Sequence, residues 1–417
     1  MSVLELTKEQ KIVLNLVARS LRFDSSELVL SEDDLKEADW KIVLREVVLQ
    51  AVALATFDAA SVYTDNIPNE VYERWKSISF NAIKNNLFVA NSQSDLIKIL
   101  GDKHKYVILK GQAAASYYPK AELRVLGDVD FLIESKEKNE IAKLLVDNGY
   151  DKEGEDHPNH VVFKKEKSHL EMHFEVAGIP YKEKGEVIRE YLTNIFETAK
   201  LQEQDGEKFI VPSDASHGLV LLLHMQHHML GEGFGLRHLC DWATYVNKTS
   251  QADFWEDELL PLLKQVGLYK YAQVMTKTSA MFLNTTCPNW AVEIEENVCD
   301  EIMNDILLGG NFGRKDRTRA VSGLLISERG KNGTKHGALY NLTHTLHSVV
   351  LRKFPIVKKV WILYPFLYVY KAMRYSVLCL FGKRSSFIKM APYAAERKSV
   401  YDKLGIFETE EESENAD

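Results

Sequence analysis

Apolar residues recur three and four positions apart through most of residues 4–79, for example in KIVLNLVARSL and WKIVLREVVLQAVALATF. This period matches one face of an α-helix and predicts helices in both segments. Ser31, which precedes three acidic residues, predicts the start of another helix. A further helix is expected over residues 81–100, ending near Gly101. We therefore interpret residues 1–85 as an N-terminal helical subdomain.

The pattern changes over residues 86–212, where short β-branched runs alternate with segments of helical period. Four strands are predicted, over residues 106–109, 131–133, 160–165 and 169–176. After the second of them, EKNEIAKLLVDNGY has the helical period, and Gly149 suits a C-terminal cap. Strands and helices that alternate in this way predict a mixed α/β core.

Helical period returns after residue 212 and continues, with interruptions, toward the end of the chain. We interpret residues 213–328 as a helical domain and residues 329–417 as a basic, aromatic helical region with an acidic tail expected to be disordered. The predicted fold class is therefore α+β, with a small mixed sheet flanked by N- and C-terminal helical regions.

The formal net charge of −8 argues against a general nucleic-acid-binding protein, because such proteins present a basic surface that neutralises phosphates. Four cysteines lie far apart and form no CxxC pair, so neither a zinc knuckle nor a disulfide framework is indicated. Charged residues interrupt the apolar positions of the first 20 residues, which is not the pattern of a signal peptide. A cytoplasmic location is expected.

Two aspartates carry the clearest chemical signal. Asp128 and Asp130 flank Val129 at strand spacing, and alternation along a strand turns both carboxylates to the same face. Two like charges so close repel each other unless a divalent cation lies between them, and Mg²⁺ prefers carboxylate and phosphate oxygens. Upstream, Gly111 ends an apolar strand at a point where the backbone can approach a phosphate closely.

These segments resemble the uncharacterised nucleotidyltransferase family of the DNA polymerase β-like superfamily. In that family a strand reads Leu-Lys-Gly, an arginine precedes Gly-Asp-hydrophobic-Asp, and an acidic residue followed by x-His closes the site. The chain matches these positions with Lys110 and Gly111, Arg124 and Gly127, Asp128 and Asp130, and Glu171 and His173. Two positions depart from the usual pattern: Gln112 replaces a small residue, and Glu171 stands where an aspartate is common.

The resemblance implies an enzyme that transfers a nucleoside monophosphate from a nucleoside triphosphate, expected to be ATP, to a hydroxyl acceptor such as a sugar, a small molecule or a protein. Asp128, Asp130 and Glu171 would bind Mg²⁺ or Mn²⁺. The residues expected to contact the nucleotide are Lys110, Gly111, Gln112, Arg124, Gly127, His173, His228 and Arg237. A structural ion pair between Arg124 and one of the aspartates, and a hydrogen-bonded strand histidine at His173, stay open alternatives.

A histidine-rich segment, HGLVLLLHMQHHMLGEGFGLRHLCDW, follows the core. His224, His227 and His228 are spaced for one helical face, which also suits a metal. The resemblance instead makes this segment the second wall of a nucleotide cleft, with Arg237 paired to Asp241 or reaching a phosphate. Two alternatives to the transferase stay open: a metal-dependent hydrolase that uses the cluster at 224–241, and a nucleotide-binding scaffold without catalysis.

The last region has an unusual charge distribution. Residues 329–395 contain twelve lysines and arginines and no acidic residue, so the rest of a chain that totals −8 carries −20. Its segment 350–390 mixes tyrosines with basic residues and has no uninterrupted apolar run of transmembrane length. Three interpretations stay open: peripheral contact with an anionic membrane at its inner face, binding of nucleic acid, and a helix that packs on the catalytic domain.

Overall fold

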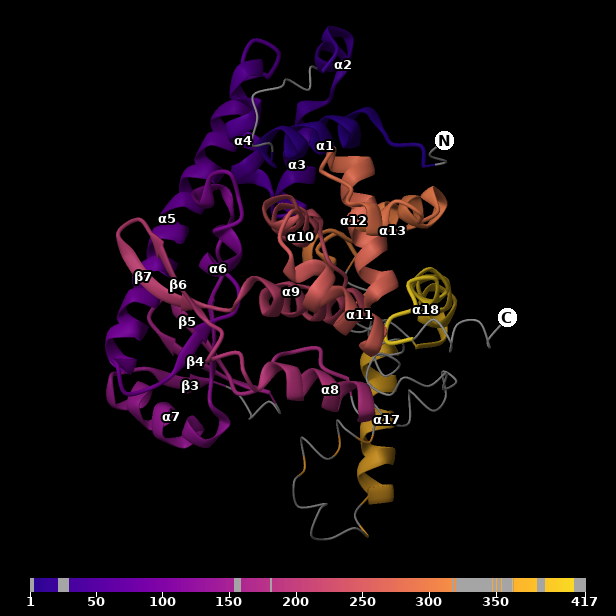
Figure 1. Ribbon diagram of the computed structural model, residues 1–417. Coiled ribbons are helices and arrows are strands. Elements are labelled where there is room, and N and C mark those ends of the chain that lie inside the picture. The colour runs from indigo at the N-terminus through magenta and orange to yellow at the C-terminus, as the bar shows by residue number, and fades with distance from the viewer. Residues whose placement is uncertain are drawn as a thin grey trace.

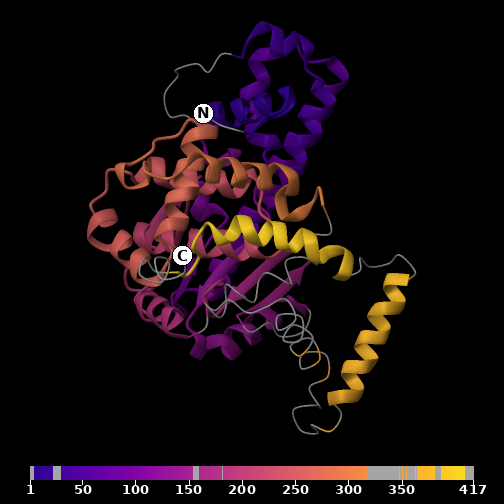
Figure 2. The same cartoon turned by 90° about the vertical axis from the view of Figure 1, so that its right-hand side faces the viewer.

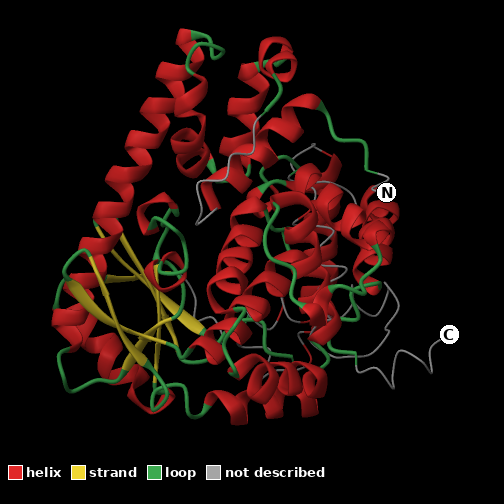
Figure 3. Ribbon diagram, turned by 45° about the horizontal axis from the view of Figure 1, so that its top comes forward, coloured by secondary structure: helices red, strands yellow, loops and turns green. Residues whose placement is uncertain are grey.

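The computed structural model describes residues 4–21, 30–153, 159–180, 182–316, 364–380 and 387–408, and the single residues 319, 347, 350, 354 and 362. Much of the basic region and most of the acidic tail lie outside these residues. Within the described part, helices surround one small mixed sheet, as Figures 1 and 3 show. The α+β fold class predicted from the sequence is confirmed.

Five helices precede the sheet: α1 (Lys8–Leu21), α2 (Glu32–Glu37), α3 (Trp40–Leu49), α4 (Ala53–Ala60) and α5 (Asn69–Leu100). The Ser31 side chain accepts a hydrogen bond from the Asp34 N–H, so it caps α2 as predicted. The buried Trp75 indole donates to the Ala53 carbonyl and ties α5 to α4. Because α5 is one continuous helix, the boundary predicted at residue 85 falls inside it.

The central sheet has five strands: β1 (Tyr106–Ile108), β2 (Val129–Ile133), β3 (Asp151–Glu153), β4 (His160–Lys165) and β5 (Ser168–His173). Their order is β1-β2-β5-β4-β3, and only the central pair β2·β5 is parallel. The four predicted strands correspond to β1, β2, β4 and β5. The connection from β2 to β5 contains α7 (Lys138–Asp147), the helix predicted after residue 133.

The two faces of the sheet have different partners. Phe131 and Ile133 pack in a cluster with Leu96 of α5 and Leu145 of α7, so these helices cover one face. Leu132 belongs to the other cluster, which includes α9 and most of the helical region. Asp130 shares its strand face with Leu132. The aspartate therefore points toward the helices that follow the core.

Two elements after the sheet were not predicted. Helix α8 (Lys182–Leu192) and a hairpin of β6 (Lys200–Gln204) and β7 (Glu207–Val211) connect the sheet to the helical region. Four of their ten strand residues are charged and only two are buried, so the sequence shows no alternation of apolar and polar positions that would predict these strands.

The helical region consists of α9 (Asp214–Leu230), α10 (Leu236–Thr249), α11 (Leu260–Val266), α12 (Tyr269–Leu283) and α13 (Glu296–Gly309). It shares one apolar core with α1, α3 and α4. Two later helices, α17 (Tyr364–Leu380) and α18 (Phe387–Asp402), lie on the side of the molecule away from the sheet, as Figure 1 shows. None of the helices in the described part of the chain has the length and apolar character needed to cross a bilayer.

Candidate active site

Asp130 and Glu171 lie side by side at the centre of the sheet. They are direct partners in the parallel pairing of β2 with β5, so both side chains leave the same face. Asp128 precedes β2 by one residue and lines the same cavity as the other two carboxylates. All three predicted carboxylates therefore line one cavity, but the group whose ligand atoms lie within 4.8 Å of one another joins Asp130 and Glu171 to His173 and does not include Asp128.

Two positively charged or protonatable groups hold Asp130. Its Oδ1 lies 2.7 Å from Lys110 Nζ and 3.0 Å from His173 Nε2, and that nitrogen is also 3.4 Å from Glu171 Oε2. Burial alone would raise the pKa of Asp130, but the charge of Lys110 and the His173 hydrogen bond lower it well below its usual value. Asp130 is thus ionised at any physiological pH.

Asp128 is in the opposite situation. Repulsion from Asp130, followed by burial, raises the pKa of Asp128 to about 6, and Lys110 offsets this only in part. The site therefore gathers more negative charge than Lys110 compensates. Carboxylate oxygens of Asp128, Asp130 and Glu171 are the ligands that Mg²⁺ and Mn²⁺ prefer, so the donor set fits the expected divalent cation. Ligand atoms of Asp130, Glu171 and His173 also lie within 4.8 Å of one another.

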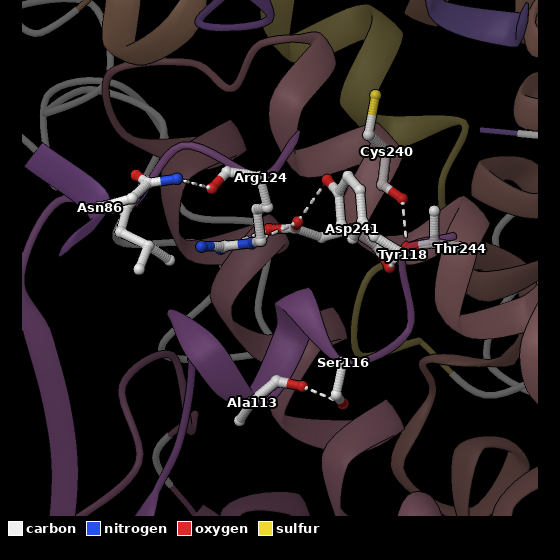
Figure 4. Close-up of polar contacts among 9 residues, drawn as sticks. Asn86, Ala113, Ser116, Tyr118, Arg124, Cys240, Asp241 and Thr244 are labelled. Carbon is white, nitrogen blue, oxygen red and sulfur yellow. Dashed lines mark hydrogen bonds and ion pairs between the residues drawn. The ribbon is translucent and has the colours of Figure 1, made fainter. Parts of the chain in front are cut away.

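The loop that leads to the aspartates is fixed from two sides. Asn86 of α5 donates to the carbonyls of Glu122 and Arg124 and accepts from the Leu126 N–H, as Figure 4 shows in part. On the other side Gly111 has φ of 60°, and a Cβ there would lie 3.6 Å from the Asp128 carbonyl. Only glycine adopts this backbone conformation without strain. The turn after β1 therefore depends on the backbone freedom of Gly111, whereas the 3.6 Å separation is itself an ordinary van der Waals contact.

Arg124 is joined to the helical region by a buried ion pair. Its Nε and Nη2 donate to the two carboxylate oxygens of Asp241 at 2.7 and 2.8 Å, and the Tyr118 hydroxyl donates to Oδ1 at 2.7 Å (Figure 4). The sequence suggested Asp241 as a partner of Arg237, and Asp128 or Asp130 as the alternative partner of Arg124. The structure differs in both respects, because α10 packs beside the aspartate loop and places Asp241 against Arg124.

Three histidines from two helices meet on the opposite side of the cavity. His224 and His228 of α9 have ring centroids 4.4 Å apart, and both lie about 5.5 Å from the ring of His238 on α10 (5.5 and 5.4 Å). The sequence predicted a cluster of His224, His227 and His228. In the structure His227 is exposed, and the third member of the cluster is His238. Burial lowers the pKa of each of the three clustered histidines well below 6.5, so their rings are neutral.

Two hydrogen-bond donors in this part of the structure have no protein acceptor. Arg237 Nε and His238 Nε2 are buried and unpartnered. The Gly235 N–H donates to His238 Nδ1 at 3.4 Å, which leaves the proton of the neutral ring on Nε2. Unsatisfied buried donors are costly, and Arg237 lines the cavity, so its free donor indicates a ligand that accepts hydrogen bonds. His238 is not among the lining residues and packs against the two histidines that are. We call His224, His228 and Arg237, with His238 packed behind them, the helical wall, and Lys110, Asp128, Asp130 and Glu171 the carboxylate wall.

The cavity between these walls has a volume of about 780 Å³. The predicted site residues that line it are Lys110, Gly111, Arg124, Gly127, Asp128, Asp130, Glu171, His228 and Arg237. Gln112 does not, because it begins helix α6 (Gln112–Ala115) with its side chain buried in the core. His173 lies two residues deeper along β5 and contacts the carboxylates from there. The prediction missed Lys167 and His169, although His169 has the same strand spacing from Glu171 as His173.

A comparison with protein families agrees with this geometry. The model of an uncharacterised nucleotidyltransferase family matches residues 36–284, which is more than half of the chain. The chain belongs to this family. The match includes both walls of the nucleotidyltransferase cavity, and α13, α17 and α18 follow it. No curated protein and no solved structure matched the chain.

Proposed function

We propose that this nucleotidyltransferase moves a nucleoside monophosphate from a nucleoside triphosphate, ATP in the first instance, to a hydroxyl group of a sugar, a small molecule or a protein. The single observation that carries the proposal is the pairing of Asp130 with Glu171 across the parallel strands, beside Asp128 and Lys110, in a cavity whose other wall holds unsatisfied donors. Carboxylates on one side and donors on the other suit a metal-bound polyphosphate.

In the proposed reaction the acceptor oxygen attacks the α-phosphorus, the bond from that phosphorus to the bridging oxygen breaks, and pyrophosphate leaves. Glu171, the most exposed of the paired groups, accepts the hydroxyl proton. A divalent cation held by Asp128, Asp130 and Glu171 would supply charge neutralisation of the phosphates and a lower pKa for the attacking hydroxyl. Lys110 lies at the same carboxylates and adds positive charge where the α-phosphate would bind.

The helical wall would hold the leaving pyrophosphate. Arg237 lines the cavity and its Nε needs an acceptor, which a phosphate oxygen would provide. Arg124 would act indirectly, because both of its bonds go to Asp241, and it would position the aspartate loop against α10. On the remaining side, Val48, Leu54 and Ile78 line the cavity and offer an apolar surface for the nucleotide base.

The experiment uses the full chain, Mg²⁺ or Mn²⁺, a cell extract and a triphosphate labelled at the α-phosphorus or, separately, at the γ-phosphorus. We expect transfer of the α label alone, and none with Asp130→Asn. A matched control is Asp147→Asn, which changes an exposed aspartate on α7 and should transfer label at the wild-type rate. Transfer of the γ label would contradict the proposal, because it would show that the enzyme transfers a phosphoryl group and not a nucleotidyl group. Binding of triphosphate without any transfer would favour the scaffold.

A metal-dependent hydrolase is the second candidate, since ligand atoms of His224, His228 and His238 lie within 4.8 Å of one another. Three observations weigh against it. The proton on His238 Nε2 removes the lone pair that a metal needs, the adjacent Arg237 guanidinium repels a cation, and both oxygens of Asp241 are already bonded. Zinc retained through purification, together with hydrolytic activity that survives Asp130→Asn, would support the hydrolase over the transferase.

A further inference from the structure

Helix α17 presents a stripe of apolar side chains to solvent. Ile362, just ahead of the helix, is 61% exposed, and Phe366, Val369, Met373 and Val377 are 71, 57, 59 and 48% exposed. Their spacings of four, three, four and four residues place all five on one face. At 1.5 Å per residue the stripe is roughly 22 Å long. A continuous apolar row of this length on a surface marks a binding region rather than scattered exposure.

The opposite face of α17 makes the polar contacts. Tyr368 shares a hydrogen bond of 2.9 Å with His347, whose ring stacks on Tyr364. The Lys371 ammonium lies 5.2 Å from the centre of the Phe354 ring. A helix on the surface of a water-soluble domain has the reverse arrangement, with its apolar side turned inward. Figure 2 shows α17 extending away from the helical body.

The charge of this part of the sequence indicates what the partner is. Residues 329–395 contain twelve lysines and arginines and no acidic residue, in a chain of net charge −8, and Lys371 and Arg374 lie on α17 itself. An apolar stripe needs an apolar environment, which a nucleic acid does not offer, and a basic segment needs anions. An anionic lipid surface provides both at once, and Tyr370, 45% exposed beside the stripe, suits its polar boundary. The exposed Arg374 on the same side adds attraction to lipid head groups.

We propose that α17 lies in the interface of an anionic bilayer, parallel to its plane, with the stripe from Ile362 to Val377 inserted among the acyl chains. This surface follows the family-matched residues and is separate from the cavity. The interpretation of the region as a helix packed on the catalytic domain gives way to it, because the apolar face is the one that packs on nothing among the described residues.

The test is flotation of the full chain with vesicles of phosphatidylcholine alone or with 30% phosphatidylglycerol. We expect the protein to float with the anionic vesicles at low salt, to float much less with neutral vesicles, and to be released in part by 0.5 M NaCl. The triple variant Phe366→Gln, Val369→Gln, Met373→Gln should remain at the bottom of the gradient. Glutamine has good helix propensity, so the change removes apolar surface and retains the helix.

The matched control also removes three exposed apolar side chains, at Val146→Gln, Leu201→Gln and Leu308→Gln on other elements, and should float like the wild type. A fluorophore at Met373→Cys should shift to the blue with anionic vesicles. Absence of flotation by the wild type at low salt, or equal flotation of the α17 variant, would overturn the proposal. So would a dimer without lipid that the α17 variant abolishes, because the stripe would then bind a second copy of the chain.

Discussion

The two walls of the cavity are both largely buried, but they differ in how their charges are compensated. On the carboxylate wall, Asp130 has partners within the protein, Lys110 at 2.7 Å and His173 at 3.0 Å. On the helical wall the histidines are neutral, and two donors have no acceptor. Strand pairing assembles the carboxylate wall within the protein, whereas the proposed nucleotide would supply the acceptor that the helical wall lacks. Substitutions on the two walls should therefore affect different steps.

The largest effect is expected on the carboxylate wall. Glu171→Gln keeps the shape of the side chain and removes its charge, so nucleotidyl transfer should fall by at least ~10³-fold while triphosphate binding changes little. Single-turnover rates and equilibrium binding separate the two quantities. Glu153→Gln serves as the control, because it makes the same substitution at an exposed residue of the same sheet and should leave the transfer rate unchanged. A Glu171→Gln enzyme with full kcat would remove this residue from the chemistry.

The Arg124–Asp241 ion pair, which joins the aspartate loop to α10, should have its main effect on the free energy of unfolding. Asp241→Asn leaves the buried Arg124 charge without its partner, so the free energy of unfolding should fall by about 3–5 kcal/mol. Glu32→Gln removes a solvent-exposed ion pair with Lys36 and should cost less than about 1 kcal/mol. Urea denaturation of both variants measures the difference. Equal losses in the two variants would show that the Arg124–Asp241 pair does not hold the walls together.

The helical wall should affect affinity more than rate. Removing one charged donor with Arg237→Met should weaken triphosphate binding by roughly 10–100-fold, the range of a charge-assisted hydrogen bond, with a smaller change in kcat. Nucleoside monophosphate, which lacks the β- and γ-phosphates, should bind both proteins alike. If Arg237→Met weakened the binding of monophosphate and triphosphate equally, Arg237 would lie outside the pyrophosphate subsite.

The smallest effect concerns pH. Burial lowers the pKa of His217 on α9 to about 4. Between pH 6.5 and 4 this histidine is therefore protonated in the unfolded chain but not in the folded one, so the free energy of unfolding falls as the pH falls. Asp128, with a pKa of about 6, acts in the opposite direction, because the folded protein is protonated there first as pH falls. In metal-free buffer, His217→Asn should flatten the decline in stability from pH 7 to 5, and Asp128→Asn should steepen it. Parallel denaturation curves for the three proteins would contradict both signs.

Much of the carboxylate wall was predictable because its geometry is local. Alternation along β2 and β5 sets which side chains share a face, so the spacing of Asp128 and Asp130 and the acidic residue in the later strand were sufficient to predict convergence. The same rule applied to His169 would have placed it on the cavity as well. Gln112 shows the limit of this reasoning, because one residue after the strand the chain becomes helical and the side chain turns into the core.

The sequence by itself determined the α+β class, four of the five strands of the central sheet and the acidic residues that line one face of it, since these follow from periodicities of two and 3.6 residues; the short, exposed β3 was not predicted. Only the tertiary structure decided that Asp241 pairs with Arg124, that His238 rather than His227 completes the histidine cluster, and that α17 turns its apolar face outward. The reason is physical: Arg124 and Asp241 lie 117 residues apart, the histidines come from two separate helices, and the outward face of α17 depends on what the helix packs against. Each of these features depends on how whole helices pack and not on the period along one segment.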